Sequence, residues 1–538
     1  MNTKPYADLI LSGNAVFTGL SDKPEPAAIA IVGNKIAAIG SKEEVAAYKG
    51  PQTKEYDAGD QLIMPGMHDF HLHIMFGSIA MEGVQLFQAR SQQEAIEMVR
   101  QHAQNVPADE WVLGFVWDAA YWDNQELPTR QSLDEVFPDR PVLLFHAEGH
   151  YAWVNSKALE LAGVTRESEN PPFGIIARDE AGDATGILYE SAIGLVANKA
   201  FDLPREKKMT LFQNFLKEAR TCGITSVSDL YGTDISKKLD DFTLFREAEE
   251  KGELTSRVHL FPALDGDLER ARSQREMYQS DKLRVSGLKQ FIDGVITGRT
   301  AWLIGSYADR EGHEGEPAFP VETILKWVEE ADKEGFNVRF HSIGEAAIRL
   351  ALDAFEQAAN VNGPRDRRHA VEHVEVIHPD DITRFGQLGV IASQQPDHMA
   401  MSERGVYTDR IGAEREPYVF VTRSLQQAGA PLAFSSDFPI DVLNPMIQIY
   451  RAVTRIDSSG KNVWHPEQRV SLADALRAYT WGGAYGTERE HELGTLEAGK
   501  LADIAVLDRN LFEAPVEQIP ETKAVLTVMD GKIVFSAE

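Results

Sequence analysis

Eight short apolar segments recur along the middle of this 538-residue chain, and helical stretches such as Lys207–Thr221 and Ala346–Ala358 lie between them. Alternation of buried strands with helices is typical of parallel sheets, because a parallel connection needs a dozen or more residues. Eight is also the number of strands that closes a (β/α)₈ TIM barrel, so we expect that α/β fold. The predicted strands are Leu62–His73, Ile224–Leu230, Arg257–Leu264, Val285–Asp293, Asn337–His341, His369–Val376, Val390–Gln395 and Pro431–Phe438.

The two ends of the chain have a different pattern, in which short β-strands are joined by tight turns. Gly33-Asn34 and Asp530-Gly531 are both hairpin-turn signals. We expect one small β-sandwich built from residues 1–64 and 492–538, with the barrel of residues 65–491 inserted between its two parts.

The first and second predicted barrel strands are separated by about 150 residues, far more than a normal connection needs. An inserted α+β subdomain at about residues 85–195 would account for the excess length.

Composition excludes several kinds of partner and site. The net charge of −29 argues against nucleic acid and anionic membranes, which need a basic surface. The single cysteine, Cys222, excludes an internal disulfide and a cysteine-rich zinc site. We see no signal peptide and no apolar run of about 18 residues, so we expect a cytoplasmic protein.

The tripeptide His71-Leu72-His73 ends the first predicted barrel strand. Side chains two residues apart in a strand point to the same face, so both imidazoles point the same way. Two neutral imidazoles that converge on one point make half of a metal site. Because such a tripeptide often occurs by chance, the prediction depends on the other strand ends.

Four later strands carry polar residues, namely Lys289, His341, His373 and Asp437, and chemistry in such barrels lies at the C-terminal strand ends. Taken alone, three of these residues also fit a purely structural role. His341 fits a hydrogen-bonded core histidine, Lys289 an ion pair with Asp293, and Asp437 a helix N-cap. Together with the tripeptide, these readings would need six coincidences at one barrel mouth, so we expect a metal site.

Motifs spread over nearly the whole chain match one known pattern. They are Pro65–His73, Trp111–Gly114, His150–Leu159, Gly223–Val227, Lys289–Thr300, His341–Glu345, Glu372–His373, Ser436–Pro439 and Gly494–Asp503. In these segments the chain resembles the amidohydrolase superfamily, and within it the YtcJ-like group (amidohydrolase family 3) that includes the N-substituted formamide deformylases.

The resemblance implies a metal-dependent hydrolase and assigns its ligands. His71 and His73 would bind the more buried metal ion, which Asp437 would also reach. His341 and His373 would bind a second ion.

The resemblance also implies that Lys289 is carboxylated by CO₂ and bridges the two ions. Carboxylation turns a cation, which would repel metals, into an anionic oxygen ligand. A site with one ion is compatible with the same residues. Zinc suits imidazole and carboxylate ligands best, with Mn, Co, Fe and Ni as alternatives.

In the implied mechanism Asp437 is the general base and then the general acid. The metal would polarise a carbonyl group, helped by a histidine for which His341 is the candidate. We expect His150, Trp117 and Trp302 to contact the substrate. The structural alternatives are a hydrogen-bonded loop histidine and two core aromatic residues.

We therefore expect hydrolysis of a carbon–nitrogen bond in a non-peptide amide, an N-formyl or N-acyl amine or a related compound. The alternative on the same site is hydrolysis of an ester, lactone, carbamate or phosphoester. An isomerase, a pseudoenzyme and a metal-binding scaffold are further alternatives. The complete ligand set argues against a pseudoenzyme, and a scaffold does not explain why Asp437 is placed as a base. The expected partners are a small-molecule substrate and, in a homodimer, a second copy of the chain.

Overall fold

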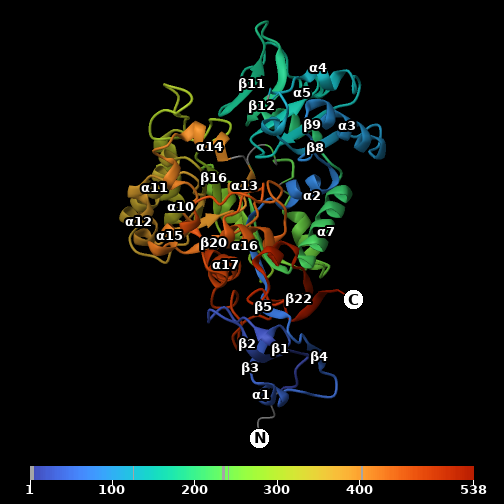
Figure 1. Ribbon diagram of the computed structural model, residues 1–538, viewed down its shortest axis with the longest axis vertical. Coiled ribbons are helices and arrows are strands. Elements are labelled where there is room, and N and C mark those ends of the chain that lie inside the picture. The colour runs from blue at the N-terminus through green and yellow to red at the C-terminus, as the bar shows by residue number, and fades with distance from the viewer. Residues whose placement is uncertain are drawn as a thin grey trace.

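The computed structural model describes residues 5–124, 126–232, 235, 237–239, 241–401 and 404–537. Three regions follow one another along the long axis of the molecule in Figure 1. A sheet built from both chain ends lies at the bottom, parallel strands with their helices lie in the middle, and a further sheet lies at the top.

Strands from both ends of the chain form one hydrogen-bonded sheet of eight strands, in the order β23-β22-β21-β5-β1-β2-β3 with β4 paired to β1. Leu11, Ile29, Ile504 and Val528, from early and late strands, share one core. The sequence predicts a small β-sandwich here, and hydrogen bonds link the strands of both chain ends into one path. The strands are β1 (Leu9–Val16), β2 (Glu25–Val32), β3 (Lys35–Gly40), β4 (Lys54–Asp57), β5 (Leu62–Pro65), β21 (Ile504–Leu507), β22 (Ala524–Met529) and β23 (Lys532–Ser536).

The middle region contains parallel strands in two groups, ordered β15-β14-β13-β6 and β16-β17-β18-β19-β20. Two parallel bridges join the edges of these groups, Leu72 to Phe438 and Ala263 to Lys289. Parallel pairing places the carboxyl ends of the strands at one side. The strands are β6 (Met67–Leu72), β13 (Ile224–Leu230), β14 (Arg257–Phe261), β15 (Leu283–Val285), β16 (Leu288–Phe291), β17 (Val338–Ser342), β18 (Ala370–His373), β19 (Ile391–Gln394) and β20 (Leu432–Phe434).

Two predicted strands are each divided in the structure, which corrects the sequence analysis. Leu62–His73 splits at Gly66 into β5, in the terminal sheet, and β6. A Cβ at Gly66 would lie 2.2 Å from Oγ1 of Thr225, so glycine allows the close approach of the two segments. Val285–Asp293 splits around Gly287, where a Cβ would lie 2.6 Å from a backbone carbonyl oxygen.

The long segment between β6 and β13 forms a mixed sheet of six strands, in the order β11-β12-β10-β9-β8-β7. Its core includes Trp117, Trp122 and Trp153. The strands are β7 (Val84–Gln85), β8 (Val112–Trp117), β9 (Val142–His146), β10 (Tyr151–Val154), β11 (Gly174–Arg178) and β12 (Ala184–Glu190). The helices of this segment are α2 (Ile74–Glu82), α3 (Gln92–His102), α4 (Arg130–Asp134), α5 (Ser156–Ala162), α6 (Ile193–Ala200) and α7 (Arg205–Thr221).

Helices of the middle region pack one apolar face on the parallel strands. In α11, Ala347, Ala351, Ala354 and Ala358 recur at helical spacing and are buried. The other helices are α1 (Lys42–Ala46), α8 (Thr243–Glu250), α9 (Leu268–Met277), α10 (Val321–Lys333), α11 (Glu345–Asn362), α12 (Pro379–Leu388), α13 (His398–Met401), α14 (Arg404–Ile411), α15 (Thr422–Gln427), α16 (Pro445–Thr454), α17 (Leu472–Ala478) and α18 (Trp481–Gly486). Short 3₁₀ helices span Ala103–Asn105, Ala119–Tyr121, Glu416–Tyr418, Pro466–Gln468 and Val516–Glu521.

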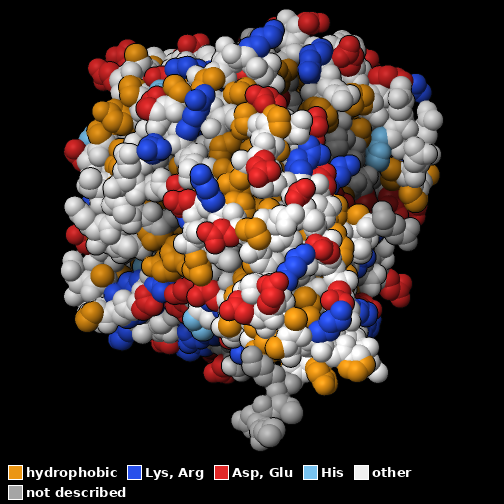
Figure 2. Space-filling view, turned by 60° about the horizontal axis from the view of Figure 1, so that its bottom comes forward, with side chains coloured by type: hydrophobic (Ala, Val, Ile, Leu, Met, Phe, Trp, Pro, Cys, Tyr) orange, Lys and Arg blue, Asp and Glu red, His pale blue; other side chains and the backbone are white. Residues whose placement is uncertain are grey.

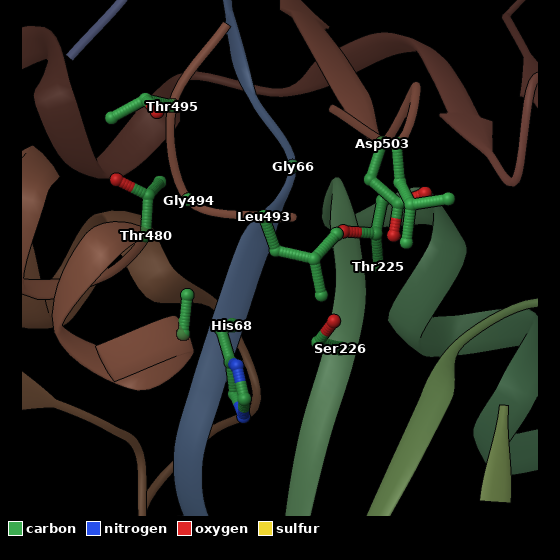
Figure 3. Close-up of a pocket in the computed structure, with 11 residues that line it drawn as sticks. Gly66, His68, Thr225, Ser226, Thr480, Leu493, Gly494, Thr495 and Asp503 are labelled. Carbon is green, nitrogen blue, oxygen red and sulfur yellow. The ribbon is translucent and has the colours of Figure 1, made fainter. Parts of the chain in front are cut away.

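A small polar cavity marks the junction between the terminal sheet and the parallel strands. Figure 3 shows His68, Thr225 and Asp503 among the residues that line it. Beside it, the buried guanidinium of Arg257 lies 2.8 Å from the carboxylate of Asp503 and ties the two regions together. The cavity volume of about 10 Å³ is that of a single water molecule, so it is too small for an organic substrate.

Acidic and basic side chains are interspersed over the face shown in Figure 2. Within the described ranges, every helix is too short or too polar to cross a membrane.

Candidate metal centre

The ends of β6 and β20 bring two histidines and an aspartate together. The N–H of Asp437 donates to the carbonyl of His71 at 2.8 Å, and the N–H of His73 donates to the carbonyl of Phe438 at 2.9 Å. The Nε2 atoms of His71 and His73 each lie 3.3 Å from Oδ1 of Asp437. We call His71, His73 and Asp437 the first triad.

In both imidazoles of the first triad, the Nδ1 atom contacts a neighbouring oxygen. Nδ1 of His71 lies 2.8 Å from Glu372, whose other oxygen accepts from Arg339 at 2.6 Å. Nδ1 of His73 donates to the carbonyl of Leu230 at 2.8 Å. These contacts direct each Nε2 toward Asp437, as outer partners do at metal sites. Burial lowers the pKa of His71 to about 4, so this imidazole is neutral and free to bind a metal at neutral pH.

A second group uses the other oxygen of the same aspartate. Nδ1 of His373 lies 3.9 Å and Nε2 of His398 lies 3.7 Å from Oδ2 of Asp437. The two imidazole rings stack at 5.5 Å with an angle of 12°. We call His373, His398 and Asp437 the second triad. Each triad brings ligand atoms within 4.8 Å of one another.

Sequence reasoning missed His398, which follows β19 by four residues and begins α13. The available signal was a histidine shortly after a predicted strand, as for Asp437 after β20. The structural alternatives considered for Asp437, a helix N-cap, and for Lys289, an ion pair with Asp293, are wrong. Asn444 caps α16 in place of Asp437. Asp293 accepts three backbone N–H groups and has no ion pair with Lys289.

His341 and Lys289 lie beside the triads but outside both. The His341 ring is 4.5 Å from the His373 ring, and its Nε2 lies 3.1 Å from the carbonyl of Gly294. The Lys289 ammonium is buried 4.2 Å from the ring centre of Phe291. Burial lowers the pKa of Lys289 to about 8.

Several buried polar atoms of the site have no hydrogen-bond partner among the described residues. Atoms of this kind are the ones that a metal ion could satisfy. Among the described residues, Oδ1 of Asp437, Nδ1 of His373, Nε2 of His398 and Nζ of Lys289 are buried without a hydrogen bond. Each such group costs about 1–3 kcal/mol when nothing satisfies it. A bound cation would satisfy the carboxylate and both imidazoles. Nitrogen and oxygen donors of these types suit a divalent transition metal, zinc above all.

Two residues of the triads have a strained backbone. Asp437 has φ of 57° and His373 has φ of 73°, in the left-handed region that non-glycine residues rarely adopt. Such strain costs about 1–3 kcal/mol per residue and is typical of functional sites.

A cavity of about 650 Å³ opens over the triads, and His71, His73, His341, His373 and Asp437 contribute to its wall. Its apolar lining comes from several aromatic and aliphatic side chains, namely Phe76, Phe173, Leu195, Phe291 and Phe319.

His150 also lines this cavity, with its ring 5.1 Å from that of His341. Nδ1 of His150 lies 2.8 Å from Glu190, which also accepts from the hydroxyl of Thr300 at 2.7 Å. Burial alone would lower the pKa of His150, but the carboxylates of Glu190, Glu148 and Asp437 together outweigh it and the pKa is raised.

Neither tryptophan expected at the substrate is on the described wall of the cavity. Trp117 is fully buried in the core of the inserted sheet, where its Nε1 donates to the carbonyl of Leu144 at 2.9 Å. Trp302 packs against the main core, and its backbone N–H donates to the carboxylate of Asp293 at 2.9 Å. These positions favour the structural alternative of two core aromatic residues, and contact with the substrate stays a prediction from the sequence.

Comparison with known proteins gives a family and several relatives. A profile of the amidohydrolase family matches residues 54–535. Protein LONG AFTER FAR-RED 3 of Arabidopsis thaliana is 32% identical over 98% of this chain and 92% of its own length. The putative amidohydrolase YtcJ of Bacillus subtilis is 28% identical, over 98% and 99%. The N-substituted formamide deformylase of Arthrobacter pascens is 27% identical, over 94% of both chains.

Solved structures agree with these matches. The crystal structure of an uncharacterized metal-dependent hydrolase from Pyrococcus horikoshii superimposes with a TM-score of 0.76 at 26% identity. The similarity covers 95% of this chain and 99% of that one, so it includes the terminal sheet, the parallel strands and the inserted sheet.

Proposed function

Because this chain belongs to the amidohydrolase family, we propose that it is a metal-dependent hydrolase of a carbon–nitrogen bond in a non-peptide amide, such as an N-formyl or N-acyl amine. The observation that carries the proposal is that two triads of possible ligand atoms meet at Asp437. Asp437, His71, His73 and His373 lie on the wall of one large cavity, and the described residues offer Oδ1 of Asp437 and Nδ1 of His373 no hydrogen bond. The name of the deformylase relative supports the choice of bond.

The first triad would hold one metal ion, and His373 and His341 belong to the proposed ligands of a second. A bound zinc ion polarises a carbonyl group and lowers the pKa of water to about 7. Lys289 is proposed to carry a carboxylate formed from CO₂. Its buried amine, which has no hydrogen bond with any described residue, supports that assignment.

Asp437 is the proposed base. Burial favours its neutral form, but the His71 and His73 imidazoles outweigh this and hold the pKa of Asp437 below its usual range, so it is a carboxylate at neutral pH. Its oxygens face both triads. From there it would take a proton from the attacking water and deliver it to the leaving nitrogen.

His150 and His341 are proposed to act on the carbonyl side. The raised pKa of His150 favours the imidazolium, whose Nε2–H, the one not facing Glu190, could stabilise a developing oxyanion. The carbonyl of Gly294 accepts from Nε2 of His341 and leaves its Nδ1 unprotonated for a metal or a donor.

The cavity favours a substrate with a sizeable apolar group. Its volume of about 650 Å³ lies in the range of small-molecule sites, about 300–1,000 Å³, and phenylalanine side chains form much of its apolar wall. An ester, lactone, carbamate or phosphoester could be attacked at the same site and is the alternative function.

We also propose that β6, β13, β14 and β16 to β20 form the (β/α)₈ barrel. The parallel pairings and the bridges Leu72–Phe438 and Ala263–Lys289 support a closed ring. Residues 1–64 with 492–538 would form one domain, and about 85–195 the inserted subdomain. Homodimer formation and a cytoplasmic location stay predictions from the sequence.

A hydrolysis screen tests the proposed function. Zinc-loaded enzyme is incubated with N-formyl and N-acyl amines, carbamates, lactones and phosphoesters, and amine and acid are measured separately. We expect equal amounts of amine and acid from an amide substrate and no release with Asp437→Asn. Turnover confined to lactones or phosphoesters would select the alternative, and no amide turnover by the zinc-loaded enzyme would contradict the proposal.

A further inference from the structure

A fifth imidazole, that of His398, faces the aspartate at the centre of the site. It is absent from the ligand set implied by the resemblance, yet its Nε2 lies 3.7 Å from Oδ2 of Asp437. Nε2 of His398 and Nδ1 of His373 are both buried, and neither has a hydrogen bond with any described residue. We propose that His398 is a metal ligand, which binds a divalent ion together with His373 and Asp437.

The orientation of His398 is that of a ligand. Its Nδ1 lies 3.4 Å from Oε1 of Glu375, and the other oxygen of Glu375 accepts from the hydroxyl of Tyr407. A carboxylate behind an imidazole fixes the ring and raises the basicity of the ligating nitrogen. Glu372 has the same relation to His71 in the first triad. One segment, residues 372–375, therefore supplies the orienting carboxylate to both triads.

Neighbouring elements fix the backbone that carries His398. The N–H of His398 donates to the carbonyl of Gln395 at 3.0 Å. The N–H of Asp397 donates to the side chain of Gln448 at 2.8 Å, and Arg451 pairs with the Asp397 carboxylate. Helix α16 thus holds the start of α13 against the site.

The space beside His398 is suitable for an ion and a water molecule. A cavity of about 30 Å³ is lined by His373, His398, Glu375, Tyr407 and Asp437, among others. A single water molecule needs a cavity of about 10–15 Å³. The wall is polar at the triad, so the cavity fits a hydrated cation better than an apolar group.

The position of His341 differs from that of His398. Nε2 of His341 lies 3.1 Å from the carbonyl of Gly294, and neither triad includes His341. Nδ1 of His373 and Nε2 of His398 instead lie 3.9 Å and 3.7 Å from Oδ2 of Asp437. The proposal rests on the proposed function only in requiring that the chain binds metal.

The test is the zinc content of a His398→Asn variant, measured by elemental analysis after reconstitution and gel filtration. We expect a twofold fall in zinc per chain, from two ions to one, with an unchanged circular dichroism spectrum. His378→Asn is the matched control, because Asn can replace His378 as the N-cap of α12, and it should keep the full zinc content. Cobalt-loaded protein provides a second readout, since loss of an imidazole ligand alters the visible absorption.

Glu375→Gln keeps the shape of the side chain and tests the same assignment without touching a ligand. Loss of an orienting carboxylate lowers metal affinity about 10–100-fold, which chelator competition would measure for one of the two ions.

The outcomes separate this inference from the proposed function. Wild-type protein that binds no zinc would overturn both. Zinc-binding wild-type protein whose His398→Asn and Glu375→Gln variants keep its zinc content and affinity would overturn only the role of His398. A His398→Asn variant that keeps all its zinc but loses turnover would make His398 a substrate contact and would also overturn the proposal.

Discussion

The two triads share Asp437 but differ in how firmly their imidazoles are held. In the first triad both Nδ1 atoms lie 2.8 Å from a fixed acceptor, and both Nε2 atoms lie 3.3 Å from Asp437. In the second triad the distances to Asp437 are 3.7 Å and 3.9 Å, and His398 lies 3.4 Å from Glu375.

The difference follows from the elements that carry the ligands. The first triad and its supports come from the ends of β6, β13, β18 and β20. Strands flank β13 and β18 on both sides, and a parallel bridge from Leu72 to Phe438 joins the edges of β6 and β20. The second triad depends on the first residue of the short helix α13 and on His373, whose φ is 73°. Sites built on strands hold their geometry better than sites on loops. We therefore expect the first triad to be preformed and the second to tighten when a metal binds.

Asp437→Asn breaks both triads at once and has the largest expected effect. The amide has the shape of the carboxylate but can neither accept the proton nor neutralise two ions. We expect kcat to fall about 10²–10⁴-fold, the range for loss of a general acid–base, together with loss of bound zinc. Steady-state kinetics and elemental analysis would measure the two effects.

Asp380→Asn, which removes an exposed carboxylate of α12, is the control and should change neither quantity. A variant of Asp437 with wild-type kcat and zinc content would remove that residue from both triads.

Glu372→Gln and Glu375→Gln compare the supports of the two triads. Glu372 and Arg339 are both fully buried, so Glu372→Gln leaves an unpaired buried guanidinium and should cost about 3–5 kcal/mol. Glu375 is bonded to Tyr407 and faces His398, and its loss should cost about 1–3 kcal/mol. Urea unfolding of metal-free protein would measure both. Equal costs would contradict the idea that the first triad is the firmer one.

The ligands that sequence reasoning found share a local signature. His71 and His73 occupy alternate positions in a strand, and Asp437 follows a buried strand directly, so strand periodicity and strand ends were enough to select them. His398 has no such signature, because the loop after β19 and the start of a short helix place it. The packing of α16 against Asp397 and the contact with Glu375 hold it at the site.

Fold prediction is limited for the same reason, because contacts between residues far apart in the sequence decide details that local patterns do not show. Alternating apolar segments indicated the parallel strands, but the break between β5 and β6 depends on contact between Gly66 and Thr225, far apart in the sequence. Trp117 lies in a strand whose two faces are both apolar, so its pattern did not show which face meets the cavity. Its burial depends on Trp122 and Trp153, which pack around it.

The smallest expected effect is a pH dependence of opposite sign in the two triads of the metal-free protein. Burial lowers the pKa of His71 from 6.5 to about 4, so between these values the unfolded chain binds more protons and stability falls as pH falls. For His398, burial alone would lower the pKa, but Glu375 and Asp437 outweigh it and raise the pKa above 6.5. The contribution of His398 to the stability of the fold is therefore complete below pH 6.5. It is lost as the pH rises through the raised pKa of the folded state.

Urea unfolding of metal-free protein between pH 5 and pH 8 would separate the two contributions, at about 1.4 kcal/mol per unit of pKa shift. His71→Asn should remove part of the loss of stability on the acid side, and His398→Asn should remove part of the loss on the neutral side. The same pH profile in both variants would mean that the two imidazoles have the same environment. In that case the contrast between a preformed and a tightening triad would fail.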